Sequence, residues 1–330
     1  MAAAGAGGPA GPRVDGTLGT AEAIALIGSA RTPADLFAAD AARRYRLLAR
    51  LTHPDSRPGD DRAAAAFARL SQLWQRHQAR TGAGALAARG DLANLYLLPA
   101  GLLKLARDPA DNDLMDREAT ALATLGAQVP ARLAAYFPRL AEVRRVVDPR
   151  SGVMRRANLI GRLDGFVTLA QVRAAFPGGL DARDAAWMWR RLLVAIGAAH
   201  QAGLVHGAVL PEHVLIHPAK HGLALADWCY AGPPGSPLPA IVGRYRDWYP
   251  PEVPGRGPAG PDTDIWLASA CMTDLTGNLL AAPLGAFARG CMLASPARRP
   301  RDAWRLLAEL DDLLGRLYGP RMFRPFAMPT

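Results

Sequence analysis

The segment that constrains the fold most is His206–Asp227, with the sequence HGAVLPEHVLIHPAKHGLALAD. A histidine and a proline-containing loop lead into the apolar run Val214-Leu215-Ile216, and a polar turn separates this run from a second one, Leu223–Ala226. We predict two short strands joined by a tight turn, which hold the loop and Asp227 at one wall of a cleft. A lone carboxylate at the end of a strand suits a Mg²⁺ ion that shares substrate phosphates.

This segment resembles the catalytic loop and the metal-binding strand of the protein kinase fold. Kinases carry an HRD-x-K-x-x-N run, where this chain has His206-Gly207-Ala208, then Leu210 and His213; their DFG element corresponds to Asp227-Trp228-Cys229. The resemblance implies that Ala208 replaces the proton-accepting aspartate, Leu210 the phosphate-contacting lysine and His213 the second metal-ligating asparagine. We therefore expect no catalytic residue in this loop, in which His206, Ala208 and His213 are the degenerate positions.

Length and composition place the chain among globular proteins. It has 330 residues, half of them apolar, which is enough for one large domain or two smaller ones. Every long apolar run is interrupted by Arg, Asp, Gly or Pro, and the N-terminus consists of Ala, Gly and Pro, so we expect neither a membrane span nor a signal peptide. Cys229, Cys271 and Cys291 form no metal spacing or disulfide framework, which favours a reducing cytoplasm.

The formal net charge is +10, and two of the thirty-nine basic residues counted as Lys or Arg are lysines. A GC-rich genome, in which arginine codons replace lysine codons, accounts for this preference. The arginines are scattered among acidic residues and form no stripe with interleaved aromatic residues, so the sequence gives little support for nucleic-acid binding.

The N-terminal region divides into a tail and a helical hairpin. Residues 1–20 carry almost no large apolar side chains and are expected to be a disordered tail. Helical spacing then indicates an amphipathic helix that stops near Thr52, shortly before Pro54. A turn-rich connection leads to a second helix. The apolar stripe of the first helix is Phe37, Ala41, Tyr45 and Leu48, and that of the second is Phe67, Leu70, Trp74 and His77.

Residues 24–78 resemble the J-domain of DnaJ-type co-chaperones, because His53-Pro54-Asp55 lies at the connection between a basic amphipathic helix and a helix with a Phe-x-x-Leu start. The first and last helices of a full J-domain are poorly represented. The resemblance implies docking of a DnaK-type chaperone by His53, Pro54, Asp55, Arg43, Arg44, Arg46 and Arg50. A positive helix would steer the module toward an acidic partner. The alternative is an accidental tripeptide in a solvated helical hairpin.

A linker at 81–84 precedes two predicted strands, 92–98 and 101–106, the second of which places Lys104 on the same face as its apolar neighbours. A helix is expected to begin near residues 111–113, with Glu118 in its apolar row. A carboxylate on an inward face requires a cation, and Lys104 is the nearest candidate. The pair resembles the lysine–glutamate pair of the kinase small lobe.

The expected nucleotide-binding residues are Lys104, Glu118 and Asp227, which would hold ATP weakly, with Asp227 as a weak Mg²⁺ ligand. Gly90 is the sole glycine in residues 86–99, so backbone amides cannot wrap phosphates as a GxGxxG loop does. Residues 157–170 resemble the hinge strand and its exit. A zinc site is the alternative, because five histidines lie close in sequence, although their spacing matches no zinc motif. These are His200, His206, His213, His217 and His221.

Further landmarks follow toward the C-terminus. Residues 184–201 form a long apolar helical pattern with Gly203 as its stop. Tyr249-Pro250-Pro251-Glu252 is similar to the APE element of kinases, and Asp264 and Arg299 match two later residues of that fold. The resemblance implies a buried Glu252–Arg299 pair and an Asp264 that braces the backbone around His206.

Together these features predict an α+β protein in which a small J-domain-like helical module, residues 21–80, precedes a bilobal protein kinase-like domain, residues 81–320, and a C-terminal tail, residues 321–330. The predicted function is that of a co-chaperone or adaptor that recruits a DnaK-type chaperone, while the kinase-like (pseudokinase) domain binds a client, a partner or a nucleotide. Two alternatives stay open: an atypical kinase-fold enzyme with slow or altered phosphoryl or nucleotidyl transfer, and a scaffold that keeps neither ancestral activity.

Overall fold

A computed structural model describes residues 18–37, 41–80, 85–147 and 152–329 of the chain. The predicted disordered tail lies almost entirely outside the described residues, as does the predicted linker 81–84. The protein is a mixed α and β structure that divides into two compact units. Residues up to 89 form the first unit together with 95–99 and 148–153, and the rest of the chain forms the second.

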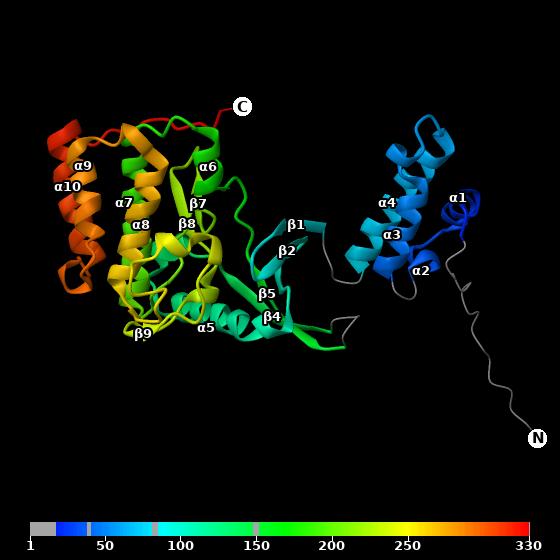
Figure 1. Ribbon diagram of the computed structural model, residues 1–330, viewed down its shortest axis with the longest axis horizontal. Helices are drawn as coiled ribbons and strands as arrows, with labels where there is room; N and C mark the ends of the chain where they lie inside the picture. The colour runs from blue at the N-terminus through cyan, green and yellow to red at the C-terminus, as the bar shows by residue number, and fades with distance from the viewer. Residues whose placement is uncertain (1–17, 38–40, 81–84, 148–151, 330) are drawn as a thin grey trace, which may run out of the picture. The chain divides into compact units, whose positions relative to one another are not determined.

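The first unit contains four helices, α1 (Thr20–Ser29), α2 (Pro33–Leu36), α3 (Ala41–Thr52) and α4 (Asp61–Arg80) (Figure 1). Helix α1 packs against both α3 and α4. It buries Ala23 and Ile27 completely, beside Leu48 of α3 and Leu70 of α4. This first helix is hard to recognise from the sequence because its buried face consists partly of alanine, which contrasts weakly with the exposed face.

Helix α3 ends where the sequence predicts. Its last residue, Thr52, donates its hydroxyl to the carbonyl of Leu48. Pro54 then opens a single 3₁₀ turn, Pro54–Ser56, for which His53 is the N-cap. Proline has no amide hydrogen to donate and disfavours helical geometry in the residue before it, so the chain turns here toward α4. The prediction that the His-Pro-Asp tripeptide lies at the bend of a helical hairpin is confirmed.

A five-stranded sheet has the strand order β1-β2-β3-β5-β4, and its strands β3, β4 and β5 belong to the second unit. Strand β5 pairs antiparallel with both β3 and β4, and Lys104 of β3 lies opposite Asn158 of β5. Helix α5 (Asn112–Gln128) follows β3 and buries Glu118 together with its leucines. The strands are β1 (Ala85–Arg89), β2 (Ala93–Leu98), β3 (Gly101–Ala106), β4 (Leu140–Val147) and β5 (Met154–Ile160).

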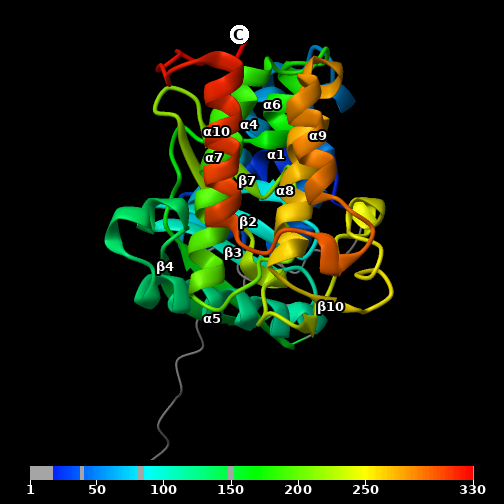
Figure 2. The ribbon, with the colours of Figure 1, turned by 90° about the vertical axis from the view of Figure 1, so that its left-hand side faces the viewer.

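The rest of the second unit is mainly helical (Figure 2). Helix α7 (Ala182–Gln201) is largely buried, with Met188, Trp189 and Leu192 at most 1% exposed. It packs between α8 (Pro261–Thr276) and α10 (Ala303–Tyr318). The remaining helices are α6 (Leu169–Ala175) and α9 (Ala282–Cys291). No helix among the described residues is long and apolar enough to cross a membrane.

The two-strand segment predicted after His206 is confirmed. Strands β7 (Val214–His217) and β8 (Gly222–Leu225) pair antiparallel, and β6 (Val167–Thr168) adds a third strand beside β7. Val214, Ile216 and Leu225 are completely buried, so the apolar runs decide which face of the hairpin meets the core. A further small sheet joins β9 (Ser236–Pro237) to β10 (Pro258–Ala259).

The predicted Glu252–Arg299 pair is also present. Arg299 donates from Nη1 to Glu252 Oε1 at 2.5 Å and from Nη2 to Glu252 Oε2 at 3.0 Å. Asp262 Oδ2 lies 3.3 Å from Nη1, and the guanidinium stacks over the ring of Trp266. The arginine side chain is completely buried, whereas that of Glu252 keeps 19% of its surface exposed. Two backbone carbonyls accept the remaining hydrogen bonds, those of Leu293 and Ala294.

Replacing this arginine should destabilise the second unit. Arg299→Ala leaves Glu252 and the buried Asp262 without their cation, and we expect the free energy of unfolding to fall by about 3 kcal/mol. The measurement is urea denaturation of the full chain. Arg301→Ala is the matched control, because that side chain is 64% exposed and lies 3.4 Å from Asp262, so the loss should stay below about 1 kcal/mol. Equal losses in the two variants would contradict this account.

Candidate functional site

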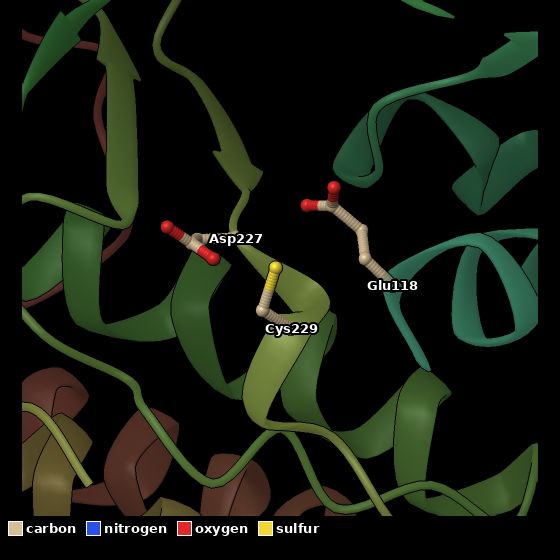
Figure 3. Close-up of side chains that lie close together, drawn as sticks. All are labelled: Glu118, Asp227 and Cys229. Carbon is tan, nitrogen blue, oxygen red and sulfur yellow. The ribbon is translucent and has the colours of Figure 1, made fainter. Parts of the chain in front are cut away.

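The candidate site is a buried cluster of charges around Lys104. Its Nζ lies 2.8 Å from Glu118 Oε1 and 2.7 Å from Asp227 Oδ1. Cys229 Sγ is 3.3 Å from the same nitrogen. Figure 3 shows Glu118 on α5, with Asp227 and Cys229 on the segment that follows β8. The structure thus brings together the three residues that the sequence predicted as nucleotide-binding and confirms the Lys104–Glu118 pair.

Three segments far apart in sequence deliver these groups. Lys104 lies in the middle of β3, where the neighbouring residues are buried, and Glu118 follows one turn after Leu114 on the buried face of α5. Asp227 directly follows the β7–β8 hairpin and has a left-handed backbone, φ +63° and ψ +66°. Aspartate tolerates this conformation better than most residues. The turn sends the chain into the short 3₁₀ segment Trp228–Tyr230, whose residues are buried.

The protonation of the groups in the cluster depends on two opposing effects, burial and the charges of the neighbouring groups. Burial alone would lower the pKa of Lys104, but Asp227, Cys229 and Glu118 together raise it well above its ordinary value. Burial would likewise raise the pKa of Asp227, yet the neighbouring Lys104 holds it below its usual range. The pKa of the Cys229 thiol is raised well above normal, first by burial and then by Glu118. These directions favour the ammonium form of Lys104, the carboxylate form of Asp227 and the neutral thiol of Cys229.

Asn158 is a member of the cluster that the sequence analysis missed. It is completely buried and donates from Nδ2 to Glu118 Oε2 at 3.0 Å and to the carbonyl of Met115 at 2.9 Å. Because Lys104 holds the other oxygen of Glu118, both carboxylate oxygens have a donor. The signal in the sequence was an asparagine inside the apolar run Ala157–Ile160, which is costly unless a partner is present.

The loop before β7 is fixed by Asp264, as predicted. This completely buried carboxylate accepts from the backbone amides of His206 and Gly207, at 2.8 and 2.9 Å, and contacts His200 Nε2 at 2.9 Å. His206 itself is neutral: its Nδ1 accepts from the amide of Ala208 and its Nε2 faces the carbonyl of Ala226. Burial lowers the pKa of His206 to about 4, in agreement with these contacts.

The residues at the degenerate loop positions His206, Ala208 and His213 are buried in the protein. Ala208, Val209 and Leu210 are completely buried. His213, at the position predicted for a lost asparagine, holds the carbonyl of Ala208 through Nδ1 at 2.8 Å and lies 3.4 Å from Asp227 Oδ2 through Nε2. The side chains of Ala208, Val209 and Leu210 carry no group that could accept a proton.

The donors around Asp227 do not suit Mg²⁺, which prefers a shell of oxygen ligands. Lys104 and His213 face the two oxygens of Asp227, and the nearby side chains offer sulfur and nitrogen. Glu118, Asp227 and Cys229 place possible ligand atoms within 4.8 Å of one another, but the ammonium of Lys104 contacts all three residues. That cation already balances the charge which a metal ion would neutralise.

The alternative zinc site finds no support within the described parts of the chain. The single group there of three or more possible metal ligands is the Glu118, Asp227 and Cys229 set, which contains no histidine. His217 packs against Phe166, and His221 stacks on Trp187. The five histidines are close in sequence, but they occupy three separate places in the structure: the Asp264 brace, the buried loop and the turn between β7 and β8.

The second candidate site is the tripeptide in the first unit. The side chains of His53 and Asp55 are 42% and 90% exposed. The His53 ring packs edge-on against Phe67 at 4.8 Å, and its Nδ1 accepts from the amide of Asp55 at 3.2 Å. These two contacts hold the histidine in one orientation while the aspartate projects into solvent.

The four predicted arginines of α3 do not share one face. Arg43, Arg46 and Arg50 are exposed and recur at i, i+3 and i+7, which places them on one stripe. Arg44 lies one turn before the buried Leu48, and its Nε and Nη2 atoms are buried without a hydrogen-bond partner among the described residues. Arg44 is therefore less exposed than the other three arginines, because the helical repeat turns it toward Leu48. Its predicted contact with a chaperone stays a prediction.

Comparison with known proteins adds no assignment. No protein-family model matches the chain, and no curated protein matches it significantly.

Removing the central ammonium should be costly. Lys104→Met keeps the length of the side chain but removes the cation beside the buried Glu118 and the partly exposed Asp227, so we expect a loss of about 3–5 kcal/mol in the free energy of unfolding. Urea denaturation measures it. Lys220→Met, at the chain's other lysine, is the control: that residue is exposed, and its replacement should change stability by less than about 0.5 kcal/mol. A Lys104→Met protein as stable as this control would show that the cluster is dispensable.

Proposed function

We propose that this protein is a co-chaperone adaptor of the cytoplasm. In this proposal the first unit is a J-domain-like module that engages a DnaK-type chaperone through His53, Pro54 and Asp55. The second unit is a bilobal protein kinase-like domain that does not transfer phosphate and instead binds a client or partner protein. The observation that carries the proposal is the His-Pro-Asp tripeptide, held rigidly and displayed at the bend between α3 and α4.

The surface around the tripeptide supports a charged partner. The basic stripe, Arg43, Arg46 and Arg50, runs along α3 toward the bend. A row of exposed guanidinium groups raises the rate of encounter with an acidic surface, and the exposed carboxylate of Asp55 offers a specific contact for a basic group on the same partner. Two opposite charges presented close together fix the orientation of binding as well as its rate.

The kinase-like assignment of the second unit is supported by three arrangements that the resemblance implied. These are the Lys104–Glu118 pair with Asp227 beside it, the Asp264 brace on the loop after α7, and the Glu252–Arg299 pair. Each contact joins different secondary-structure elements or loops, and all three occur in one unit.

Absence of phosphoryl transfer follows from the loop chemistry. The position of the general base holds Ala208, which is completely buried, and Leu210 fills the place of the phosphate-contacting lysine. General-base catalysis contributes roughly 10²–10⁴-fold, so its loss alone would leave a slow enzyme. Here the loop also lacks a charged group for the phosphates, and the donors near Asp227 do not suit Mg²⁺. The intact Lys104–Asp227 contact is the one observation that favours the alternative of slow or altered transfer.

The test is the ATPase activity of a DnaK-type chaperone in the presence of the full chain. The wild-type protein should stimulate the activity, and His53→Gln should reduce it to the basal rate, because glutamine does not reproduce the imidazole contacts with Phe67 and Asp55. Arg62→Gln is the matched control, since Arg62 is exposed on α4 outside the basic stripe, and it should stimulate like wild type. No stimulation by the wild-type chain, or equal stimulation by His53→Gln, would refute the proposal.

Replacing the three arginines of the basic stripe tests electrostatic attraction of the chaperone separately from the contact made by the tripeptide. Arg43→Gln/Arg46→Gln/Arg50→Gln should weaken the stimulation several-fold at low salt and much less at high salt, where exposed charges are screened. A loss that is independent of salt concentration would contradict an electrostatic role for the stripe.

A further inference from the structure

A groove lies along the second unit between helices α7 and α10, which run side by side in Figure 2, and is bordered by the chain after α10. Its volume is about 770 Å³, within the range of sites that hold small organic ligands. None of its lining residues belongs to the Lys104 cluster or to the tripeptide site.

Each helix contributes one stripe with the spacing i, i+3, i+4 and i+7. From α7 these are Arg183, Ala186, Trp187 and Arg190, and from α10 they are Asp311, Leu314, Gly315 and Tyr318. At one end the guanidinium of Arg183 lies over the ring of Tyr318, 5.0 Å from its centre. At the other end Arg190 forms a two-bond ion pair with Asp311. The small residues Ala186 and Gly315 lie between these two contacts and leave the groove open.

Gly315 shows that the space is unfilled by protein. It lies inside α10, where glycine is a poor helix former, and its backbone does not require positive φ. A Cβ atom built at this position would meet no other heavy atom within 4 Å. A larger side chain could therefore enter the groove without displacing the helix.

The groove carries positive charge that the protein does not neutralise. Arg190 is paired with Asp311, and Arg324 with Asp181 and Asp184 at 3.1 and 3.5 Å. Among the described residues, Arg183 and Arg321 have no carboxylate within 4 Å. The pKa of Arg321 is lowered by burial and then by Arg190 and Arg191, which indicates excess positive charge at this point.

The apolar side of the groove is flat and aromatic. Trp187 stacks on His221, with ring centres 4.2 Å apart and an angle of 10° between the planes. Phe323, which is 71% exposed, covers the other side of the His221 ring at 4.5 Å. Leu314 and Tyr318 face this aromatic wall from α10. A planar apolar group would be well matched to such a surface.

We propose that this groove binds a small organic anion in which a flat ring system carries a phosphate, sulfonate or carboxylate group. The ring lies on the surface formed by Trp187 and Leu314, above Gly315. The anionic group is held by Arg321, and Arg183 adds positive charge at the end of the groove next to Tyr318. Guanidinium groups bind such oxyanions through charge-assisted hydrogen bonds, and they do so most strongly where no protein carboxylate competes. The site is independent of the proposed co-chaperone function.

The probe is 1-anilinonaphthalene-8-sulfonate, whose fluorescence increases in an apolar environment, titrated into the full chain. We expect saturable binding that Gly315→Leu weakens at least tenfold by filling the groove. Arg183→Gln/Arg321→Gln should weaken binding to a similar extent by removing the anion contacts. The matched controls are Gly315→Ala and Arg289→Gln/Arg316→Gln, the latter at two exposed arginines outside the groove. Both controls should bind within about threefold of wild type, and circular dichroism establishes that every variant is folded.

Competition then tests the chemistry of the ligand. Phenyl phosphate should displace the probe, whereas inorganic phosphate and phenol at the same concentration should not, because the groove requires both the ring and the anion. Probe binding unchanged in Gly315→Leu and in Arg183→Gln/Arg321→Gln would overturn the proposal. Displacement by inorganic phosphate alone would also overturn it, since that result indicates a plain anion site.

Discussion

The ammonium of Lys104 is the interaction on which the second unit depends. It joins β3 to α5 through Glu118 and to the end of the β7–β8 hairpin through Asp227. Two carboxylates this close together would repel each other, and the groups of the cluster lose hydration where they are shielded from water. The cation compensates for both effects and makes their approach possible. Asn158 completes the arrangement by holding the second oxygen of Glu118. The same contact engages Asp227, the residue that the sequence predicted as a weak Mg²⁺ ligand.

The loop beside the cluster keeps the hydrogen bonds that fix its backbone, whereas we propose that it has lost the side chains that act on a substrate. Asp264 still fixes the backbone at His206, and His213 closes the loop onto Ala208. In the kinase-like proposal, Ala208 and Leu210, which are buried, stand where side chains that act on a substrate would be. The structural hydrogen bonds of the loop do not depend on those side chains, so the proposal assigns this loop a binding role. The first unit supplies the exposed, rigid tripeptide through which we propose a chaperone is recruited.

The sequence predicted those features of the fold and of the candidate site for which a residue or a short run allows a single structural solution. Pro54 fixed the bend after α3, the apolar runs on either side of residues 217–222 predicted β7 and β8, and an inward Glu118 required a cation. Alanine-rich α1 could not be recognised, because alanine contrasts weakly between faces, and the partial burial of Arg44 was not evident because its charge concealed its helical position. Asn158 and the groove between α7 and α10 depend on pairing across segments, which spacing along a single chain does not reveal.

The central claim is that the Lys104 cluster holds the fold together in a domain that moves no phosphate. Incubation of the full chain with Mg²⁺ and ATP, labelled in parallel at the α- and γ-phosphates, tests it directly, with Asp227→Ala as reference. Active protein kinases turn over at about 1–100 s⁻¹. The account predicts that neither label is incorporated above the level of Asp227→Ala, into the chain itself or into a general protein substrate. Incorporation that disappears in Asp227→Ala would contradict it.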